Sequence, residues 1–406
     1  MKKMIEFHEA QKTINELAYP LKNKAVNLSE ALNDVLANDI YSQYDFPAFD
    51  HSAMDGAAIK ASDLQGATEN HPIKLKLIGE VYAGDTSNFR INEGQCCWVA
   101  TGAKIPEGAD TVVPMEYFID HGNAYEFSSC SSVGSNIRTR GSFFKKETLL
   151  LEKGLELTSA EISLLACDGI SETRVNCSPV VNIITTGNEV IATSGELTPG
   201  KLYNSNVHTI SSFVKTTGCK INDVLHVADE EKELTEVISN CLESCDCLII
   251  AGGISVGKKD YVKQTLEGIG VEIIFGKINV KPGKPFLLAK KELSNKLIPI
   301  FCLPGSPVAV FYLFRTLVVP YLRRMRGINN FQDNVLKGKL SEKSTKINLK
   351  RTELIPVSAK MEAGEYILTP CPDFSSSNLK IVVEHNALAI IPPSTEYQKS
   401  VPFIFI

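Results

Sequence analysis

Long apolar runs are absent from this sequence. Apolar stretches such as 247–251 have the length of a strand, far below the roughly 18 consecutive apolar residues that suggest a membrane-spanning helix. The N-terminal stretch MKKMIEFHE meets acidic and polar residues at once, and it lacks the apolar segment of a secretory signal. We therefore expect a cytoplasmic protein that does not span a membrane.

Paired cysteine motifs and a charge excess of one sign are also missing. The eleven cysteines include the adjacent pair Cys96 and Cys97 and a loose group at 241–247, but none shows the paired C-x-x-C spacing of a zinc site. Their odd number, in a long chain without an export signal, argues against a disulfide framework, and we interpret them as small buried apolar residues. A net charge of −5 argues against a general nucleic-acid-binding protein.

The length of 406 residues and the 44% hydrophobic composition predict two to four domains with a sizeable core. Apolar residues at near-helical spacing predict helices within 1–45, with Asn27 as an N-cap, and again over 158–169. Short alternating runs such as 73–78 and 95–100 lie between these pieces and predict a β module. We therefore expect a discontinuous helical linker domain, 1–45 and 146–178, interrupted by an inserted β domain at 46–145.

Strand-like and helix-like segments alternate over 179–326. The expected strands are 180–185, 220–227, 246–251, 271–275 and 296–303, and the expected helices are 206–217, 231–244, 260–268 and 307–325. This alternation predicts a mostly parallel α/β sheet with helices on both faces, which binds ligands beyond the carboxyl ends of its strands. Candidate strands at 335–340, 365–368 and 387–391 predict a C-terminal β-barrel or sandwich over 327–406. The expected fold class is therefore α/β plus β, in several domains.

Three loops at the ends of predicted strands have residues that suit an anion. The segment 252–257 (GGISVG) joins a buried-type strand to a helix, so that Gly252, Gly253 and Gly257 let backbone N–H groups approach a phosphate and Ser255 adds a hydroxyl. It matches neither the P-loop nor the dinucleotide-binding pattern, and the alternative interpretation is a tight turn.

The second loop is KPGKP at 281–285, in which two prolines restrict the backbone that presents Lys281 and Lys284. Its alternative is an exposed basic turn. In the third loop, LPGSP at 303–307, Ser306 is a plausible N-cap with proline at the first helical position; that capping role does not exclude ligand contact.

Carboxylates form the remaining candidates. Glu189, Asp229 and Asp260 follow strands or begin helices, so all three are expected at the ligand-binding edge of the sheet, where they suggest Mg²⁺ bound through water and ligand oxygens. Acidic residues that complement a helix dipole are the alternative; it suits Asp229 and Asp260 well and Glu189 poorly. Asp55 lies in the β module. The histidines show no metal-binding spacing, and the turn with Arg138 taken alone is interpreted as solvated surface.

Taken together, these motifs resemble one family, the molybdopterin molybdenumtransferases, called MoeA in bacteria and the E domain of gephyrin in animals. The motifs that carry the resemblance occur in the family's order: FDHSAMDG at 49–56, TGA at 101–103, IRTRG at 137–141, TGNE at 186–189, GGISVG at 252–257 with DY at 260–261, KPGKPF at 281–286 and LPGSP at 303–307. The C-terminal part matches in length and β character.

The resemblance implies an elongated four-domain homodimer whose active site lies between the α/β domain of one subunit and the β domain of the other. The implied reaction joins molybdate to the dithiolene of adenylylated molybdopterin and releases AMP. The resemblance also assigns substrate contacts and a Mg²⁺ site to individual residues. The implied catalytic residues are Asp55, Thr101, Glu189, Asp229 and Asp260; those that bind substrate are Gly252, Gly253, Ser255, Gly257, Lys281, Lys284, Pro304, Ser306 and Arg138; and the metal ligands are Glu189, Asp229 and Asp260.

The chain also departs from the family pattern. Ser142, Phe143 and Phe144 stand where the family usually has Glu-Asp-Ile, and Asn188 replaces an aspartate. The usual Arg-Asp-Asp is Ala-Asp-Glu at 228–230, and 373–376 replace a Gly-Ser-Gly stretch. Two other functions are weighed: a molybdopterin adenylyltransferase, which resembles the α/β part alone, and a non-catalytic scaffold. A molybdopterin adenylyltransferase and the enzymes that receive the cofactor are possible partners.

Overall fold

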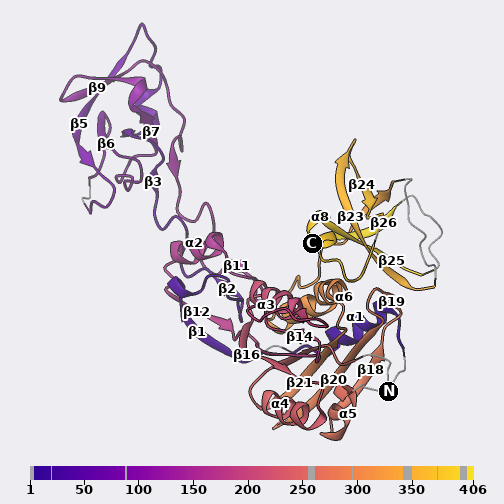
Figure 1. The fold of residues 1–406 in the computed structure, drawn as a ribbon. Helices are drawn as coiled ribbons and strands as arrows, with labels where there is room; N and C mark the ends of the chain where they lie inside the picture. Colours follow the sequence, from indigo (N-terminus) through magenta and orange to yellow (C-terminus); the bar gives the residue numbers. More distant parts are fainter. Residues whose placement is uncertain are drawn as a thin grey trace. The chain divides into compact units, whose positions relative to one another are not determined.

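The computed structural model describes residues 4–19, 21–86, 89–254, 261–294, 296–341, 350–372, 374–393 and 400–406 (Figure 1). The chain divides into two compact units. The first contains Met1–Asn38, Lys153–Thr158 and Glu172–Ile406, and the second contains Asp39–Glu152 and Ser159–Ser171. No helix in the described part of the chain is long and apolar enough to cross a membrane.

A mixed sheet organises the first unit. Its strand order is β16-β13-β17-β21-β20-β18. The bounds are Val180–Thr186 (β13), Lys220–Val227 (β16), Cys247–Ala251 (β17), Glu272–Lys277 (β18), Pro285–Leu293 (β20) and Lys296–Leu303 (β21). β16, β13, β17 and β21 are parallel, whereas β20 is antiparallel to both β21 and β18. The predicted mostly parallel sheet is confirmed, and the antiparallel strand β20 is an addition.

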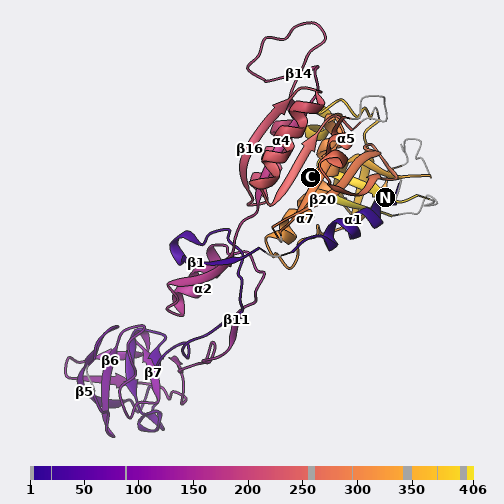
Figure 2. The same cartoon turned by 90° about the horizontal axis from the view of Figure 1, so that it is seen from below.

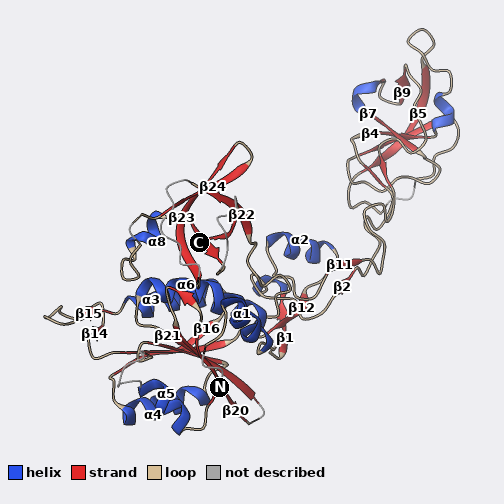
Figure 3. Ribbon diagram, turned by 90° about the vertical axis from the view of Figure 1, so that its right-hand side faces the viewer, coloured by secondary structure: helices blue, strands red, loops and turns tan. Residues whose placement is uncertain are grey.

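Helices cover both faces of this sheet (Figure 3). Their bounds are Ser205–Thr216 (α3), Glu231–Glu243 (α4), Tyr261–Gly268 (α5), Pro307–Leu313 (α6) and Val319–Met325 (α7). α4 and α5 pack against one face, in a cluster with Leu234, Ile238 and Leu266. α3, α6 and α7 contribute to the cluster on the other face. Strands such as β17, which are buried along their whole length, are apolar throughout because both faces are covered.

The N-terminal helix α1 (Phe7–Glu16) belongs to this α/β core. It lies beside α7 and buries Phe7, Ala10 and Ile14 in the same cluster (Figure 2). The helix predicted after Asn27, on the spacing of Leu28, Leu32 and Leu36, is wrong. The preceding residues Asn23–Asn27 form strand β1, which pairs with β12 (Glu172–Asn176). Only a single 3₁₀ turn, Leu28–Glu30 (η1), follows, and Asn27 makes no side-chain cap there.

This β1–β12 ribbon has a physical explanation. Val26 is buried between exposed neighbours, which is the two-residue period of a strand, and Leu32 of the supposed helical stripe is 56% exposed. The segments predicted as a helical linker, 1–45 and 146–178, therefore contain the helices α1 and α2 (Ser159–Cys167), and much of the remainder is extended. The four predicted domain boundaries remain predictions.

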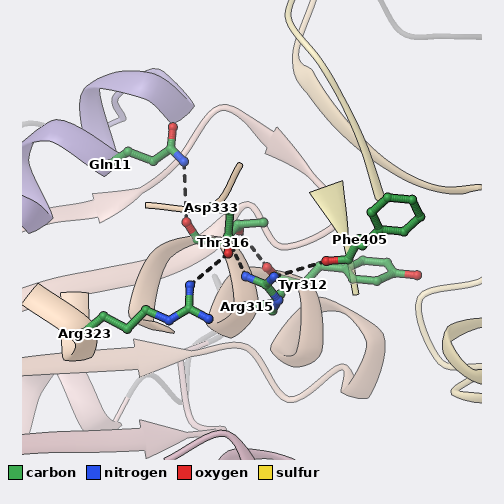
Figure 4. Close-up of polar contacts among 7 residues, drawn as sticks. All are labelled: Gln11, Tyr312, Arg315, Thr316, Arg323, Asp333 and Phe405. Atoms are coloured by element: carbon green, nitrogen blue, oxygen red, sulfur yellow. Dashed lines mark hydrogen bonds and ion pairs between the residues drawn. The ribbon is translucent and has the colours of Figure 1, made fainter. Parts of the chain in front are cut away.

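The end of the α/β segment is a helix with a π-helical turn at Phe314–Val318 (η4) between α6 and α7. Asp333 accepts hydrogen bonds from both Arg315 and Arg323, and Gln11 of α1 donates to the carbonyl oxygen of Thr316 at 3.4 Å (Figure 4). Arg315 also donates to the carbonyl oxygen of Phe405, at 3.1 Å. These contacts fasten α1 and the C-terminal strand to the same helix.

The C-terminal residues form the predicted β-barrel. Its strands are Leu336–Leu340 (β22), Thr352–Glu362 (β23), Glu365–Pro370 (β24), Ala387–Ile391 (β25) and Val401–Phe405 (β26), with helix α8 at Lys380–Glu384. The ring runs β23-β24-β22-β26-β25 and closes by pairing of β25 with β23. Strand β19 (Val280–Lys281) adds to β23 and so ties the barrel to the α/β domain.

The second unit holds a β sheet with the order β7-β4-β6-β5-β9-β8. Its elements are Ile40–Tyr41 (β2), His51–Ser52 (β3), Gly56–Ile59 (β4), Ala61–Leu64 (η2), Ile73–Val81 (β5), Gln95–Val99 (β6), Thr111–Pro114 (β7), Met115–Tyr117 (η3), Phe118–Asp120 (β8), Ala124–Phe127 (β9), Ile137–Arg138 (β10) and Leu149–Leu151 (β11). The β character predicted for this part of the chain is therefore present.

None of the eleven cysteines, all of which the structure describes, forms a disulfide bond. Eight are buried, as predicted, but Cys130 and Cys167 are exposed, so the interpretation as buried residues is wrong for these two.

Candidate functional site

A cavity of about 430 Å³ opens at the carboxyl edge of the α/β sheet. It lies where β13, β17 and β21 end, which is the edge that the sequence predicts for ligand binding. The predicted site residues on its wall are Glu189, Asp229, Gly252, Gly253 and Pro304. Ser255, Gly257 and Asp260, which the sequence assigns to the same site, lie outside the described residues.

Close packing at this edge of the sheet leaves no room for a side chain at Gly252 or Gly253. Gly252 has a φ of +100°, and a Cβ there would lie 2.3 Å from the carbonyl oxygen of Thr186. A Cβ on Gly253 would lie 2.6 Å from the side chain of Val262. The N–H of Gly252 donates to the carbonyl oxygen of Leu303 at 3.1 Å, so this donor is engaged within the protein. The tight-turn interpretation therefore holds for these residues, and the turn also forms a wall of the cavity.

Two carboxylates project from the neighbouring loops. Asp229 accepts a 2.6 Å hydrogen bond on Oδ1 from the hydroxyl of Thr186, and its N–H donates to Oδ1 of Asn188 at 3.2 Å. The Glu189 carboxylate is exposed, and its backbone carbonyl accepts from Leu202 at 2.8 Å. That contact belongs to the short ribbon of β14 (Val190–Ile191) and β15 (Leu202–Tyr203). Hydrogen bonds therefore hold the backbone of both residues that bear these carboxylates.

The described residues contain no cluster of three or more His, Cys, Asp or Glu side chains that could hold a metal ion. Two carboxylates on one cavity nevertheless suit Mg²⁺, which binds through one or two carboxylates and keeps water and substrate phosphate oxygens as its other ligands. The donor set of Glu189 and Asp229 is thus compatible with that ion.

The loop at 303–307 differs from its prediction. Ser306 occupies the N-cap position of α6, but its side chain makes no cap bond. Its hydroxyl instead donates to the carbonyl oxygen of Ser376 at 2.5 Å, and the N–H of Val308 donates to the same oxygen at 3.2 Å. The preceding Gly305 carbonyl accepts from Asn206 at 2.9 Å. A segment of the C-terminal domain therefore occupies the start of α6 and fixes the cavity rim.

The two predicted lysines do not line this cavity within the described part of the chain. Lys281 pairs with Glu353 of β23, with 3.3 Å between Nζ and Oε1; the carboxylate side chain is 5% exposed and the lysine side chain 52%. Between the lysines, Gly283 approaches α6 so closely that a Cβ would lie 2.4 Å from Leu313. Lys284 follows that contact, and its carbonyl accepts from Ile278 at 3.1 Å. The rigidity predicted for this loop stays a prediction, and the neighbouring Pro285 lines the cavity.

The remaining predicted residues belong to the second unit. The structure brings Asp55 and Thr101 together: Oδ1 of Asp55 accepts the Thr101 N–H at 2.6 Å and its hydroxyl at 2.8 Å. These two bonds, led by the backbone one, lower the pKa of Asp55. Arg138 lies over the ring of Phe143, 6.0 Å from its centroid.

The cavity of the first unit is also lined by Tyr203, Asn204 and Asn206, which the sequence motifs do not single out. Asn204 is the N-cap of α3; it accepts from the N–H of Val207 at 3.1 Å and donates to the hydroxyl of Thr185 at 2.8 Å. The segment YNSN at 203–206, before a predicted helix, is the signal that could have indicated this cap.

Comparison with known proteins agrees with this architecture. Residues 5–169 match the MoeA N-terminal region (domain I and II), 182–324 a probable molybdopterin binding domain, and 337–400 the MoeA C-terminal region (domain IV). A molybdopterin molybdenumtransferase of Staphylococcus epidermidis is 32% identical over 392 residues, which cover 96% of this chain and 92% of the relative.

Two further matches extend the comparison. The molybdopterin molybdenumtransferase of Haemophilus influenzae is 34% identical over 78% of this chain and 76% of its own length. The crystal structure of the molybdopterin biosynthesis MoeA protein from Pyrococcus horikoshii OT3 covers both chains completely with a TM-score of 0.84 and 28% identity. The chain belongs to the molybdopterin molybdenumtransferase (MoeA) family.

Proposed function

We propose that this transferase of molybdenum cofactor biosynthesis inserts molybdenum into adenylylated molybdopterin. Molybdenum forms bonds to both dithiolene sulfurs while molybdate oxygen leaves as water, and water cleaves the phosphoanhydride bond, which releases AMP. The observation that carries the proposal is the pair Glu189 and Asp229, which line one cavity with the Gly252-Gly253 turn in a member of this family. The wall is suited to a phosphorylated ligand held with a divalent cation.

In this proposal Glu189 and Asp229 hold Mg²⁺, which would neutralise charge on the phosphate and molybdate oxygens. Thr186 orients Asp229 through the 2.6 Å hydrogen bond, and the strand-end glycines allow the ligand to approach the backbone. Lys281 and Lys284 supply positive charge near the sheet edge, with Lys281 held by Glu353. Firm positioning of these side chains matters because two anionic reactants must be brought together against their electrostatic repulsion.

Asp55, Thr101 and Arg138 complete the proposed set from the second unit. We also propose a homodimer in which residues of both units act on one substrate. Complementation tests this directly: Asp55→Asn and Asp229→Asn chains are mixed after partial unfolding, and activity is assayed in the mixture. Recovery toward one quarter of the wild-type rate supports a shared site, whereas two inactive parents that stay inactive when mixed contradict it.

The reaction itself is tested with purified protein, adenylylated molybdopterin, molybdate and Mg²⁺. We expect AMP release that requires molybdate, together with transfer of active cofactor to a molybdenum-free apo-enzyme. Addition of EDTA should stop release, and excess Mg²⁺ should restore it. A matched control is Glu267→Gln, an exposed helix carboxylate paired with Lys263 at 3.8 Å, which should leave the rate unchanged.

The other outcomes identify the other functions. Tight binding of the substrate without any AMP release would favour a scaffold or carrier that receives or delivers molybdopterin among its partner enzymes. Formation of adenylylated molybdopterin from ATP would favour an adenylyltransferase. Either result would contradict the insertion reaction.

A further inference from the structure

A second cavity, of about 470 Å³, lies within the second unit, and none of the residues in the proposed metal site contributes to it. Aromatic side chains form much of its wall. The aromatic residues are Tyr44, Phe46, Phe49, His51 and Phe143. Tyr44, Phe49 and Phe143 are each at least 45% exposed, which is unusual for large apolar groups gathered at one hollow.

The rings are held in place by mutual packing. Phe46 lies 5.8 Å from Phe143 and 5.2 Å from Phe144 between ring centroids, and Phe49 meets His51 edge-on at 6.0 Å. The backbone N–H of Phe143 also donates to the carbonyl oxygen of Phe46 at 3.0 Å. The flat faces are therefore preorganised, and a planar ligand could stack on them with little ordering cost.

A cation is positioned at the same hollow. The guanidinium of Arg138 lies over Phe143, and in the described part of the chain no carboxylate pairs with it. The two acidic residues of the wall are engaged elsewhere: Asp45 accepts from Nε of Arg140 at 2.8 Å, and Asp168 accepts from the N–H of Gln43 at 2.8 Å. Arg138 therefore remains available to an incoming anion, and Arg is well suited to phosphate.

Phe143 serves both parts of this hollow. Its ring is one of the exposed aromatic surfaces, and it also lies under the guanidinium of Arg138.

We infer that this cavity binds a purine nucleoside monophosphate, with the ring stacked among Phe49, His51 and Phe143 and the phosphate on Arg138. A cavity of this volume lies in the range of small-molecule sites. The identity of the ligand as AMP rests on the proposed function, in which AMP is the nucleotide released from the substrate. The cavity thus provides a subsite for the adenylyl portion of the substrate.

Calorimetry with AMP, adenosine and ribose 5-phosphate tests this inference on the full chain. AMP should bind more tightly than either fragment, since each lacks one of the two contacts. Phe143→Asp should weaken AMP binding about tenfold or more, because it removes a stacking ring and places a carboxylate beside Arg138. Arg138→Met should remove most of the advantage of AMP over adenosine. Tyr117→Ala changes a 66% exposed aromatic residue outside the cavity and is the matched control.

Cys167 offers a local probe, because its exposed thiol lines this cavity. Cys130 is an exposed thiol of the same unit outside the cavity and serves as the internal reference. Burial raises the pKa of Cys96 and Cys97 to about 12, so both stay protonated and unreactive at pH 8. AMP should slow alkylation of Cys167 by iodoacetamide and leave Cys130 unchanged, and Phe143→Asp should abolish this protection.

The outcomes separate this inference from the proposed reaction. Suppose that AMP release depends on molybdate, but AMP does not protect Cys167 or its affinity is unchanged in Phe143→Asp and Arg138→Met. This result would overturn the subsite and leave the insertion reaction supported. Suppose instead that AMP protects Cys167, that both variants abolish this protection, and that the protein shows no molybdate-dependent AMP release. This result would support the nucleotide site and overturn the insertion reaction. Thermal melting of each variant confirms that the protein is folded at the assay temperature.

Discussion

Thr101 donates two hydrogen bonds to the same carboxylate oxygen of Asp55, from its backbone N–H at 2.6 Å and its hydroxyl at 2.8 Å. Both bonds favour the ionised carboxylate, and they lower its pKa. Asp55 therefore presents a fixed negative charge throughout the neutral range, with its second oxygen oriented by the first. This pairing joins two segments that lie 46 positions apart in the chain.

Replacing Asp55 with asparagine removes the charge and keeps the shape. We expect Asp55→Asn to fold normally and to reduce AMP release on the order of 100-fold, the effect typical of a lost charge-stabilising group in a preorganised site. Thr101→Ser keeps the hydroxyl and should retain most activity, whereas Thr101→Val should lose a large part of it. Rates are measured with saturating molybdate. Near-wild-type release by Asp55→Asn would remove Asp55 from the site.

Acid titration gives a second test of the same pair. A carboxylate whose folded-state pKa is lowered stabilises the fold above its unfolded-state pKa, and that stabilisation is lost as the pH falls through the folded value. The difference in melting temperature between wild type and Asp55→Asn should therefore be largest near pH 7 and shrink below about pH 4. A difference that stays constant to pH 3 would contradict the role of Thr101 in the pKa shift.

The sequence predicted the α/β domain well because its signals are local and repeated. The buried strand Cys247–Ala251 is apolar throughout, and the glycine turn at 252 directly follows it. The leucine spacing after Asn27 imitates a helix, and the strand Asn23–Asn27 has a pairing partner, Glu172–Asn176, that lies far along the chain. Only the three-dimensional pairing decides between the two.

The sequence also predicted part of the candidate site. Glu189, Asp229 and Gly252 follow strands of one sheet, so topology alone brings them to one edge. The environments of Lys281 and Ser306 were not predictable, since their partners Glu353 and Ser376 come from the C-terminal barrel. A motif shows which residues are present, but a partner more than 60 positions away decides which hydrogen bonds they make.

The close approach at Gly252 predicts a stability defect. Gly252→Ala places a Cβ 2.3 Å from the carbonyl oxygen of Thr186, at a φ that side chains rarely adopt. We expect a loss of about 2–4 kcal/mol in unfolding free energy from strain and overpacking together. Gly276→Ala is the control, because no heavy atom lies within 4 Å of its Cβ position. Urea unfolding compares the two, and equal midpoints would refute the close approach.

The hydrogen bond from Ser306 to the carbonyl oxygen of Ser376 predicts coupling between the cavity rim and the C-terminal domain. Phe374 anchors that segment by stacking on Tyr312, with 6.5 Å between ring centroids. We expect Ser306→Ala and Phe374→Leu each to raise the KM for adenylylated molybdopterin severalfold. Because both act on one segment, the double variant should be less than additive. Ser377→Ala, an exposed neighbour, should change nothing, and strictly additive effects would instead indicate direct substrate contact by Ser306.

We expect replacement of Arg326 to lower the stability of the first unit alone. It is 4% exposed and donates to Glu156 at 2.7 Å, to the carbonyl oxygen of Thr217 at 2.8 Å and to that of Asn33. Arg326→Met leaves these acceptors without their donor, which should cost about 3 kcal/mol. Glu156→Gln keeps an acceptor at a 41% exposed side chain and should cost less than about 1 kcal/mol.

Two probes can locate that loss. The single tryptophan, Trp98, lies in β6 of the second unit, whereas far-UV circular dichroism is dominated by helices of the first unit. Arg326→Met should lower the urea midpoint seen by circular dichroism and leave the tryptophan transition in place. Arg90→Met, which breaks an exposed pair with Glu107 at 3.6 Å, should move neither transition, because such pairs contribute little. If Arg326→Met shifts both transitions equally, the two units unfold as one cooperative body and Arg326 stabilises the whole chain.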